Sequence, residues 1–217
     1  MRSASPGWTI TPFRHNTPLQ WLIAGYAALW IGLALSPLDR SDWLLENLLA
    51  LLLALVLVVT YRWFQFSDLS YGLIVAFMFM HAIGAHYTYA EVPFGYWLQE
   101  TFGLARNPFD RLVHAAYGLL LVYPIREFLM RQAGVRGFWS YYLPVSAVLA
   151  QSGFFELVER VVVMVTNPEL GQAYLGTQGD EWDAQHDMAS ALLGAIFTGA
   201  VIYLREQSQK ILPPVHR

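Results

Sequence analysis

The chain has 217 residues, of which 56% are hydrophobic and only 13% are charged. Soluble domains carry about 25% charged residues, so this composition indicates a membrane protein. A formal net charge of −3 argues against the basic surface that nucleic acid requires. The absence of cysteine from the sequence excludes disulfides and thiolate metal ligands.

Six apolar segments are long enough to span a bilayer, so we expect an all-α bundle of six transmembrane helices. The expected spans are residues 19–36, 43–60, 69–87, 110–129, 138–165 and a last helix that begins in an acidic cluster and ends at Arg205. An aromatic loop of about twenty residues after Tyr87 suits the membrane interface. We therefore expect a cytoplasmic lead at 1–18, a transmembrane domain at 19–205 and a cytoplasmic tail at 206–217.

Basic residues indicate the orientation of the bundle, because cytoplasmic segments are enriched in lysine and arginine. With both termini inside, the cytoplasmic segments hold Arg2, Arg14, Arg62, Arg126, Arg131, Arg136, Arg205, Lys210 and Arg217. The outside segments hold only Arg40, Arg106 and Arg111, and Arg160 lies within a helix. The bias predicts that both termini are cytoplasmic.

The acidic cluster at 176–187, which opens the last helix, is the most informative stretch of the chain. It contains Asp180, Glu181, Asp183, His186 and Asp187. At about 100° per residue, Asp183, His186 and Asp187 fall on one helical face. Ser190, Gly194 and Thr198 continue that face as a stripe of small residues. Such a stripe lets another helix approach closely, so we expect the cluster at the centre of the bundle.

Other ionisable residues gather at the same outer depth, which is costly inside a membrane and usually functional. They are His81 and His86 on the third helix, Asp110, Arg111 and His114 on the fourth, and Glu156, Glu159 and Arg160 on the fifth. Imidazole and carboxylate without thiolate form a ligand set for Zn²⁺, Mn²⁺ or non-haem iron. We expect a divalent metal, zinc first and iron or manganese next.

Roles follow from residue type. The expected metal ligands are His81, His114, His186 and Asp187, with Glu156 as a further candidate. The expected catalytic carboxylates are Glu156, Glu159, Asp183 and Asp110, and the expected substrate-binding residues are Arg160 and Arg111. A catalytic metal would leave one position for water, and the remaining carboxylates would serve as general base or orient the imidazoles.

Structural explanations compete with these roles. Asp180, Asp183 and Asp110 stand where carboxylates cap helix N-termini. Glu156 and Arg160 have the i,i+4 spacing of an ion pair within one helix. The histidines could instead form a hydrogen-bonded polar network, and His86 suits the membrane interface.

The sequence resembles the YjdF-like family of bacterial inner-membrane proteins. The matching segments are 80–89, 109–114, 155–159 and 176–183, together with His186 and Asp187. The resemblance implies a small polytopic protein of the bacterial inner membrane and implies no particular reaction.

A weaker likeness is to the VanZ-like membrane proteins, which are associated with glycopeptide-antibiotic resistance. It rests on Asp110-Arg111-x-x-His114 and on Asp187-x-x-x-Ala191-x-x-Gly194. Arg111 stands in place of a lysine, and Ala191 in place of an asparagine. This likeness favours a cell-envelope lipid as substrate.

Three functions are compatible with these features. The first is a metal-dependent membrane enzyme, hydrolase-like, that acts on an envelope lipid at the outer leaflet. The second is a proton-coupled transporter or carrier that uses the same ionisable cluster, which would need a polar path to the cytoplasmic side. The third is a structural membrane partner, which leaves the cluster of charges unexplained.

Overall fold

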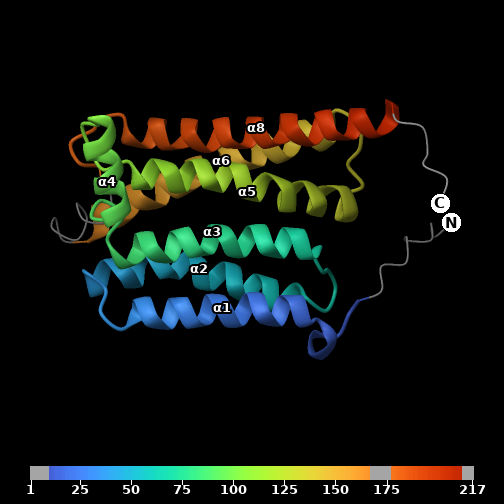
Figure 1. The fold of residues 1–217 in the computed structure, drawn as a ribbon, viewed down its shortest axis with the longest axis horizontal. Helices are drawn as coiled ribbons and strands as arrows, with labels where there is room; N and C mark the ends of the chain where they lie inside the picture. Colours follow the sequence, from blue (N-terminus) through green and yellow to red (C-terminus); the bar gives the residue numbers. More distant parts are fainter. Residues whose placement is uncertain (1–9, 167–176, 212–217) are drawn as a thin grey trace.

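The computed structural model describes residues 10–166 and 177–211, and every regular element in these ranges is helical. The elements are η1 (Phe13–His15), α1 (Thr17–Ala34), α2 (Arg40–Thr60), α3 (Asp68–His86), α4 (Pro93–Phe102), α5 (Phe109–Gln132), α6 (Trp139–Val165) and α8 (Asp183–Ile211). The expected all-α class is confirmed. The long helices lie side by side, and the short α4 crosses one end of the bundle, hereafter the α4 end (Figure 1).

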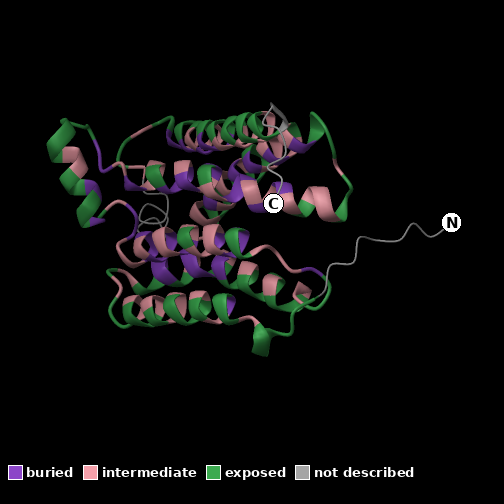
Figure 2. Ribbon diagram, turned by 45° about the vertical axis from the view of Figure 1, so that its right-hand side comes forward, coloured by how far each residue is buried: buried purple, intermediate pink, exposed green. Residues whose placement is uncertain are grey.

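Five described helices, α1, α2, α3, α5 and α8, are long and apolar enough to cross a membrane. Their outward faces carry exposed large apolar side chains, such as Leu48 and Leu55 on α2 and Leu193 and Phe197 on α8. Figure 2 shows that buried residues lie mainly on the inward faces of the helices. Soluble monomers rarely expose so much contiguous apolar surface, so these faces suit lipid. Helix α6 has 27 residues but is not among the five.

The expected spans agree with the observed helices within a few residues, with two differences. The expected interfacial loop contains α4, which begins at Pro93 and stops at Gly103, whose φ is +62°. Proline suits the first turn of a helix and glycine the left-handed position that ends it. The last helix continues past Arg205 to Ile211.

Helices α5 and α8 approach each other closely through small residues. A Cβ atom added to Gly118 of α5 would lie 1.9 Å from the carbonyl oxygen of Ala191, and one added to Gly194 of α8 would lie 2.3 Å from that of Ala115. Ala191 and Ala195 are completely buried in the same contact. The expectation that this face of the last helix meets another helix is therefore confirmed for Gly194 and Thr198, whereas His186, expected on the same face, is exposed. The contact brings the beginnings of α5 and α8 together.

Helix α5 also joins the two parts of the bundle. It packs against α6 and α8 on one side and against α3 on the other, while α3 in turn contacts α1 and α2 (Figure 1). The interior of the bundle between the α2–α3 pair and the α5–α6 pair is thus lined by four helices.

Candidate metal centre and adjoining cavity

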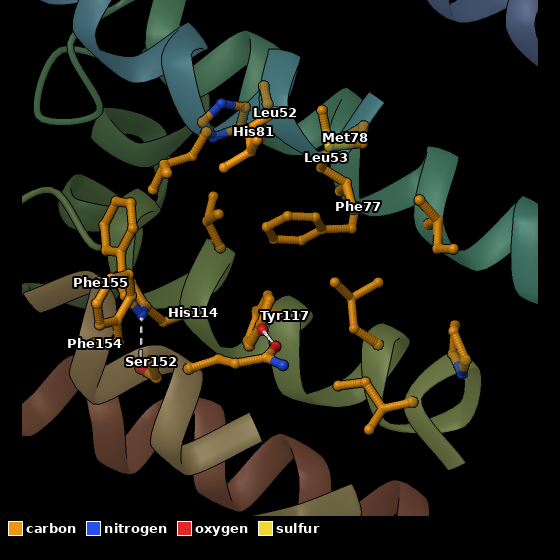
Figure 3. Close-up of a pocket in the computed structure, with 18 of the residues that line it drawn as sticks. Leu52, Leu53, Phe77, Met78, His81, His114, Tyr117, Ser152, Phe154 and Phe155 are labelled. Carbon is orange, nitrogen blue, oxygen red and sulfur yellow. Dashed lines mark hydrogen bonds between the residues drawn. The ribbon is translucent and has the colours of Figure 1, made fainter. Parts of the chain in front are cut away.

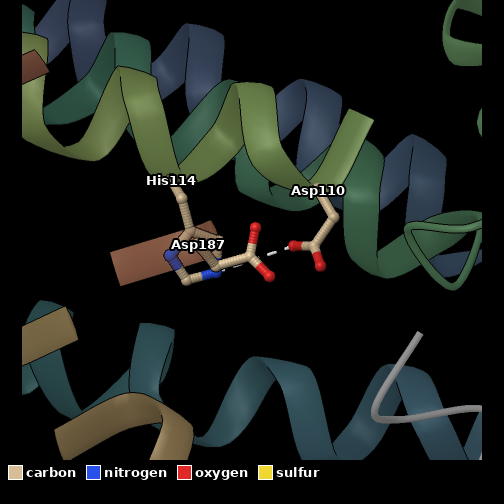
Figure 4. A group of neighbouring side chains, drawn as sticks. All are labelled: Asp110, His114 and Asp187. Carbon is tan, nitrogen blue, oxygen red and sulfur yellow. Dashed lines mark ion pairs between the residues drawn. The ribbon is translucent and has the colours of Figure 1, made fainter. Parts of the chain in front are cut away.

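Asp110, His114 and Asp187 form a compact group at the α4 end. Asp110 and His114 occupy successive turns of α5, and Asp187 lies in the second turn of α8 (Figure 4). One ligand atom from each residue lies within 4.8 Å of those of the other two. The His114 Nε2 to Asp110 Oδ1 distance is 3.7 Å. Ligands at about 2.0–2.2 Å from one tetrahedral metal lie about 3.4 Å apart, so small side-chain movements would complete the coordination.

Burying this group costs free energy unless its polar atoms have hydrogen-bond partners or a bound cation. Asp187 is only 2% exposed, and within the described part of the chain its Oδ1 has no hydrogen-bond partner. Buried polar atoms are almost always satisfied, because leaving one unpaired costs free energy. A divalent cation among two carboxylates and an imidazole would satisfy it.

The orientation of His114 suits the same role. Its Nδ1 lies 3.5 Å from the Ser152 hydroxyl on α6, which leaves Nε2 directed toward the carboxylates. An imidazole whose second nitrogen contacts a polar group is the usual arrangement of a metal-binding histidine. Glu156 Oε1 lies 3.6 Å from His114 Nε2, and Glu159, on the next turn of α6, is buried.

A second group, the arginine–aspartate network, closes the end of the bundle above the candidate centre. Arg106 pairs with Asp183, and Arg111 pairs with Asp180. His186 completes the network, because its Nδ1 lies 2.8 Å from Asp180 Oδ2. These contacts fix the segment before α8 against the start of α5.

Asp180 lies outside the membrane-spanning helices, and the main-chain N–H of Trp182 donates a hydrogen bond to its Oδ1 over 3.0 Å. This bond, followed by the one to His186, lowers the pKa of the Asp180 carboxyl below its ordinary value of 3.8. Asp180 is therefore an anion held in place by the loop, besides any contribution to starting the helix.

The other expected site residues lie apart from the candidate centre. His81 is buried on α3, where its Nδ1 lies 2.6 Å from the hydroxyl of Tyr89. The His186 side chain is 52% exposed and faces Asp180.

Arg160 is exposed on α6, and among the described residues no ion pair joins it to Glu156. His86, expected at the interface, contacts the carbonyl oxygen of Leu33 over 2.7 Å.

A cavity of about 680 Å³ adjoins the centre, between α2, α3, α5 and α6. Its polar lining residues are Glu46, His81, Tyr89, Asp110, His114, Tyr117, Gln151, Ser152 and Glu159, and the rest of the wall is apolar. Figure 3 shows His81 and His114 on different helices around this space, with Tyr117 donating a hydrogen bond to Gln151. The candidate metal centre and the cavity thus share Asp110 and His114.

The sequence interpretation missed the polar face of α2. Asp42, Glu46 and Asn47 are all at most 3% exposed, and Glu46 lines the cavity. The signal was an acidic pair with i,i+4 spacing in the first turns of an otherwise apolar span. Arg106 and Asn107 were also missed as buried residues. Asn107 supports the start of α5, because its side-chain oxygen accepts a hydrogen bond from Phe109 N over 3.0 Å.

Comparison with known proteins agrees with the membrane architecture. The family described as "Predicted membrane protein (DUF2238)" matches residues 18–208. The chain is also 38% identical over 195 residues to "Inner membrane protein YjdF" of Escherichia coli (strain K12), which covers 86% of this chain and 90% of that protein. No solved structure shows a significant match. The expected multi-pass character, inner-membrane localisation and YjdF-like resemblance are confirmed, and the chain belongs to the DUF2238 family of membrane proteins.

Proposed function

We propose that this protein is a metal-dependent membrane enzyme, hydrolase-like, that holds one divalent cation on Asp110, His114 and Asp187. The observation that supports this most is the buried Asp187 oxygen without a hydrogen-bond partner in the described structure, beside an imidazole and a second carboxylate. Zinc is the first candidate, and iron or manganese, which also accept carboxylate and imidazole, come next.

The surrounding residues suit hydrolysis. A divalent metal lowers the pKa of a bound water to about 7 and polarises a carbonyl oxygen. Glu156, 3.6 Å from His114 Nε2, is placed either to complete the ligand set or to accept the proton of the attacking water. Glu159 lies one turn further along α6. If Glu156 is a metal ligand, Glu159 would be the general base, and if Glu156 is the general base, Glu159 would complete the ligand set. Ser152 would hold the His114 ring. Asp183 would act indirectly, because it pairs with Arg106.

The proposed orientation gives the centre access to the outer leaflet. In this proposal α6 also crosses the membrane, as the fifth of six spans in the domain at 19–205, and the lead at 1–18 and the tail at 206–217 are cytoplasmic. Helix α1 starts and α8 finishes at the end opposite α4, as an even number of crossings requires (Figure 1). The distribution of arginine supports the same orientation. The α4 end would then face the periplasm.

We propose a cell-envelope lipid as substrate, because the cavity beside the centre lies within the spanning part of the bundle. Arg111 pairs with Asp180, and Arg160 is exposed on α6. Neither arginine lines the cavity, so we leave both out of the proposed substrate site.

Elemental analysis tests the metal. Protein purified in detergent without chelators should contain about one first-row metal per chain. His114→Ala and Asp187→Asn should each remove most of it, because each deletes a ligand. His186→Ala is the matched control, since that ring faces Asp180 and should leave the metal content unchanged. Folded wild-type protein that takes up no Zn²⁺, Mn²⁺ or Fe²⁺ would overturn the proposal.

A proton-coupled carrier remains the second candidate, favoured by the additional buried carboxylates Glu46 and Glu159. Far from the α4 end, however, the cavity wall consists of apolar residues such as Leu57, Ile125 and Leu129. Alternating access needs a polar route to both sides, so the enzyme is the better-supported function. Proton transport by metal-free protein in liposomes would reverse that order.

A further inference from the structure

We infer that the cavity beside the candidate metal centre binds one long-chain amphiphile, which enters sideways from the bilayer and carries a hydroxyl or amine rather than an anionic head group. This inference deepens the proposed function by describing the chain and the head group of the substrate, which would also have to carry the bond that is hydrolysed. It rests on that function only for what happens to the molecule after binding. Binding itself needs neither the metal nor turnover.

The shape of the cavity fits a chain. Its lining on α5 extends from Asp110 to Leu129, which is about 28 Å at 1.5 Å per residue. That length approaches the roughly 30 Å thickness of the hydrocarbon core. The volume of about 680 Å³ lies within the range of roughly 300–1,000 Å³ for small-molecule sites. A cavity this long along the helix axes suits an extended chain lying parallel to the neighbouring lipids.

The wall of the cavity suits the same occupant. Away from the α4 end it is formed by residues such as Leu57, Phe66, Ile125, Phe128 and Leu129. Water would find few hydrogen-bond partners there, and an empty space would forfeit the close packing typical of protein interiors. An apolar chain drawn from the membrane would fill it.

The entrance faces lipid. Leu52 of α2 and Phe154 of α6 both line the cavity, yet they are 54% and 62% exposed. Helix α2 packs against α3, whereas α6 packs against α5 and α8, so these two residues mark the opening between the two parts of the bundle (Figure 3). A lipid would enter through this opening without crossing the headgroup region.

Charge selects the head group. The ionisable residues that line the cavity are Glu46, Asp110, Glu159, His81 and His114, and no lysine or arginine is among the lining residues that the structure describes. Arg106 and Arg111, near the same end, are paired with Asp183 and Asp180. A divalent cation would be balanced by Asp110 and Asp187, so the carboxylates left over in the cavity wall are Glu46 and Glu159. A phosphate or carboxylate beside these two would meet like charge in a buried site, which is strongly unfavourable.

A hydrogen-bond donor would meet an acceptor instead. Glu46 is 3% exposed, and its Oε2 has no hydrogen-bond partner within the described residues. A hydroxyl or ammonium group at this end of the cavity would satisfy that oxygen. The geometry therefore places the head group near Glu46 and the candidate metal centre, with the chain extending away from the α4 end.

Three probes that share one sixteen-carbon chain test the head group. Delipidated protein is titrated with hexadecylamine, hexadecan-1-ol and hexadecyl sulfate, and binding is measured by native mass spectrometry. The amine and the alcohol should bind at least about tenfold more tightly than the sulfate. Glu46→Gln should narrow the difference between amine and sulfate. Equal affinity for amine and sulfate would overturn the assignment of the head group.

Two α6 variants test the place. Ala147 lines the cavity, whereas Ala150, three residues away, is exposed and does not. Ala147→Trp should weaken amine binding at least about tenfold, and Ala150→Trp should not. Hexadecylamine with a diazirine at the chain end should label wild-type α5 between Leu121 and Leu129, a readout that does not depend on a variant folding. Unchanged binding by folded Ala147→Trp, or labelling confined to α1 and α8, would overturn the site.

The metal is tested separately from the chain site. His114→Ala protein that has lost its metal should still bind hexadecan-1-ol, because the apolar wall is intact. Retained binding without metal would support the cavity even if the proposed hydrolase failed. Conversely, protein that contains stoichiometric metal but binds none of the three probes would support the proposed enzyme and contradict the amphiphile site.

Discussion

Arg106, just before α5, forms a buried ion pair with Asp183, the first residue of α8, and their side chains are 9% and 6% exposed. Removing one partner leaves the other charge buried, which costs about 3–5 kcal/mol in comparable cases. Arg106→Ala should therefore lower the free energy of unfolding by about that amount, measured by denaturation in detergent.

The double variant Arg106→Leu with Asp183→Leu should recover much of the loss, because it removes both charges. Arg160→Ala is the control. Arg160 is exposed, so its removal should change stability by no more than about 0.5 kcal/mol. A double variant no more stable than Arg106→Ala would contradict the ion-pair explanation.

Asp180 gives the network a dependence on pH. Its pKa is lowered in the folded protein, so the folded state stabilises the ionised form. The contribution is fully present above the unfolded value of 3.8 and is lost as the pH falls through the lower, folded pKa. The difference in melting temperature between wild type and Asp180→Asn should be at its full size at pH 7 and should shrink as the pH falls below about 4. A difference that does not vary between pH 7 and pH 3 would contradict this role.

The close contact of α5 and α8 predicts the effect of a single methyl group. In Gly118→Ala the new Cβ would meet the Ala191 carbonyl oxygen at 1.9 Å, and main-chain atoms cannot move aside as a flexible side chain can. Overpacking of this kind costs about 1–3 kcal/mol or more, and it should also separate His114 from Asp187. The variant should lose both stability and bound metal.

Gly72→Ala on α3 is the matched control, because nothing lies within 4 Å of its added Cβ. An alanine there should be neutral or stabilise the helix by up to about 1 kcal/mol. Equal effects of Gly118→Ala and Gly72→Ala would show that helix propensity, rather than the contact, decides the outcome.

Local spacing predicted much of the candidate centre. Asp110 and His114 share a face because they are four residues apart on one helix, and the small residues after Asp187 correctly indicated that it faces another helix. The helix boundaries followed from runs of apolar residues, since a spanning segment must satisfy its main-chain hydrogen bonds internally.

The remaining residues depended on rotation and on distant contacts. His186 and Asp187 differ by about 100° around α8, and the packing of Ala191 and Ala195 on α5 buries the Asp187 side. The position of His81 depends on Tyr89, which comes back against α3 where Gly84 has no side chain. Neither the rotation of a helix nor a chain reversal of this kind can be read from periodicity.

Membrane topology is the prediction on which the outward-facing site depends. Within residues 10–166 and 177–211, five helices meet the requirements of length and apolarity for a span, and an odd number of spans would place the termini on opposite sides. The number of spans therefore depends on α6, which carries Glu156, Glu159 and Arg160: six if α6 crosses the membrane and five if it does not. If α6 also crosses, reporters fused after Arg62, after Arg131 and at the C-terminus should all read cytoplasmic, and one inserted after Gly103 should read periplasmic. A periplasmic C-terminal reporter, with the other three as expected, would mean that α6 does not cross and that the six-span proposal is wrong. A cytoplasmic signal after Gly103 would instead invert the bundle and place the candidate metal centre on the inner side of the membrane.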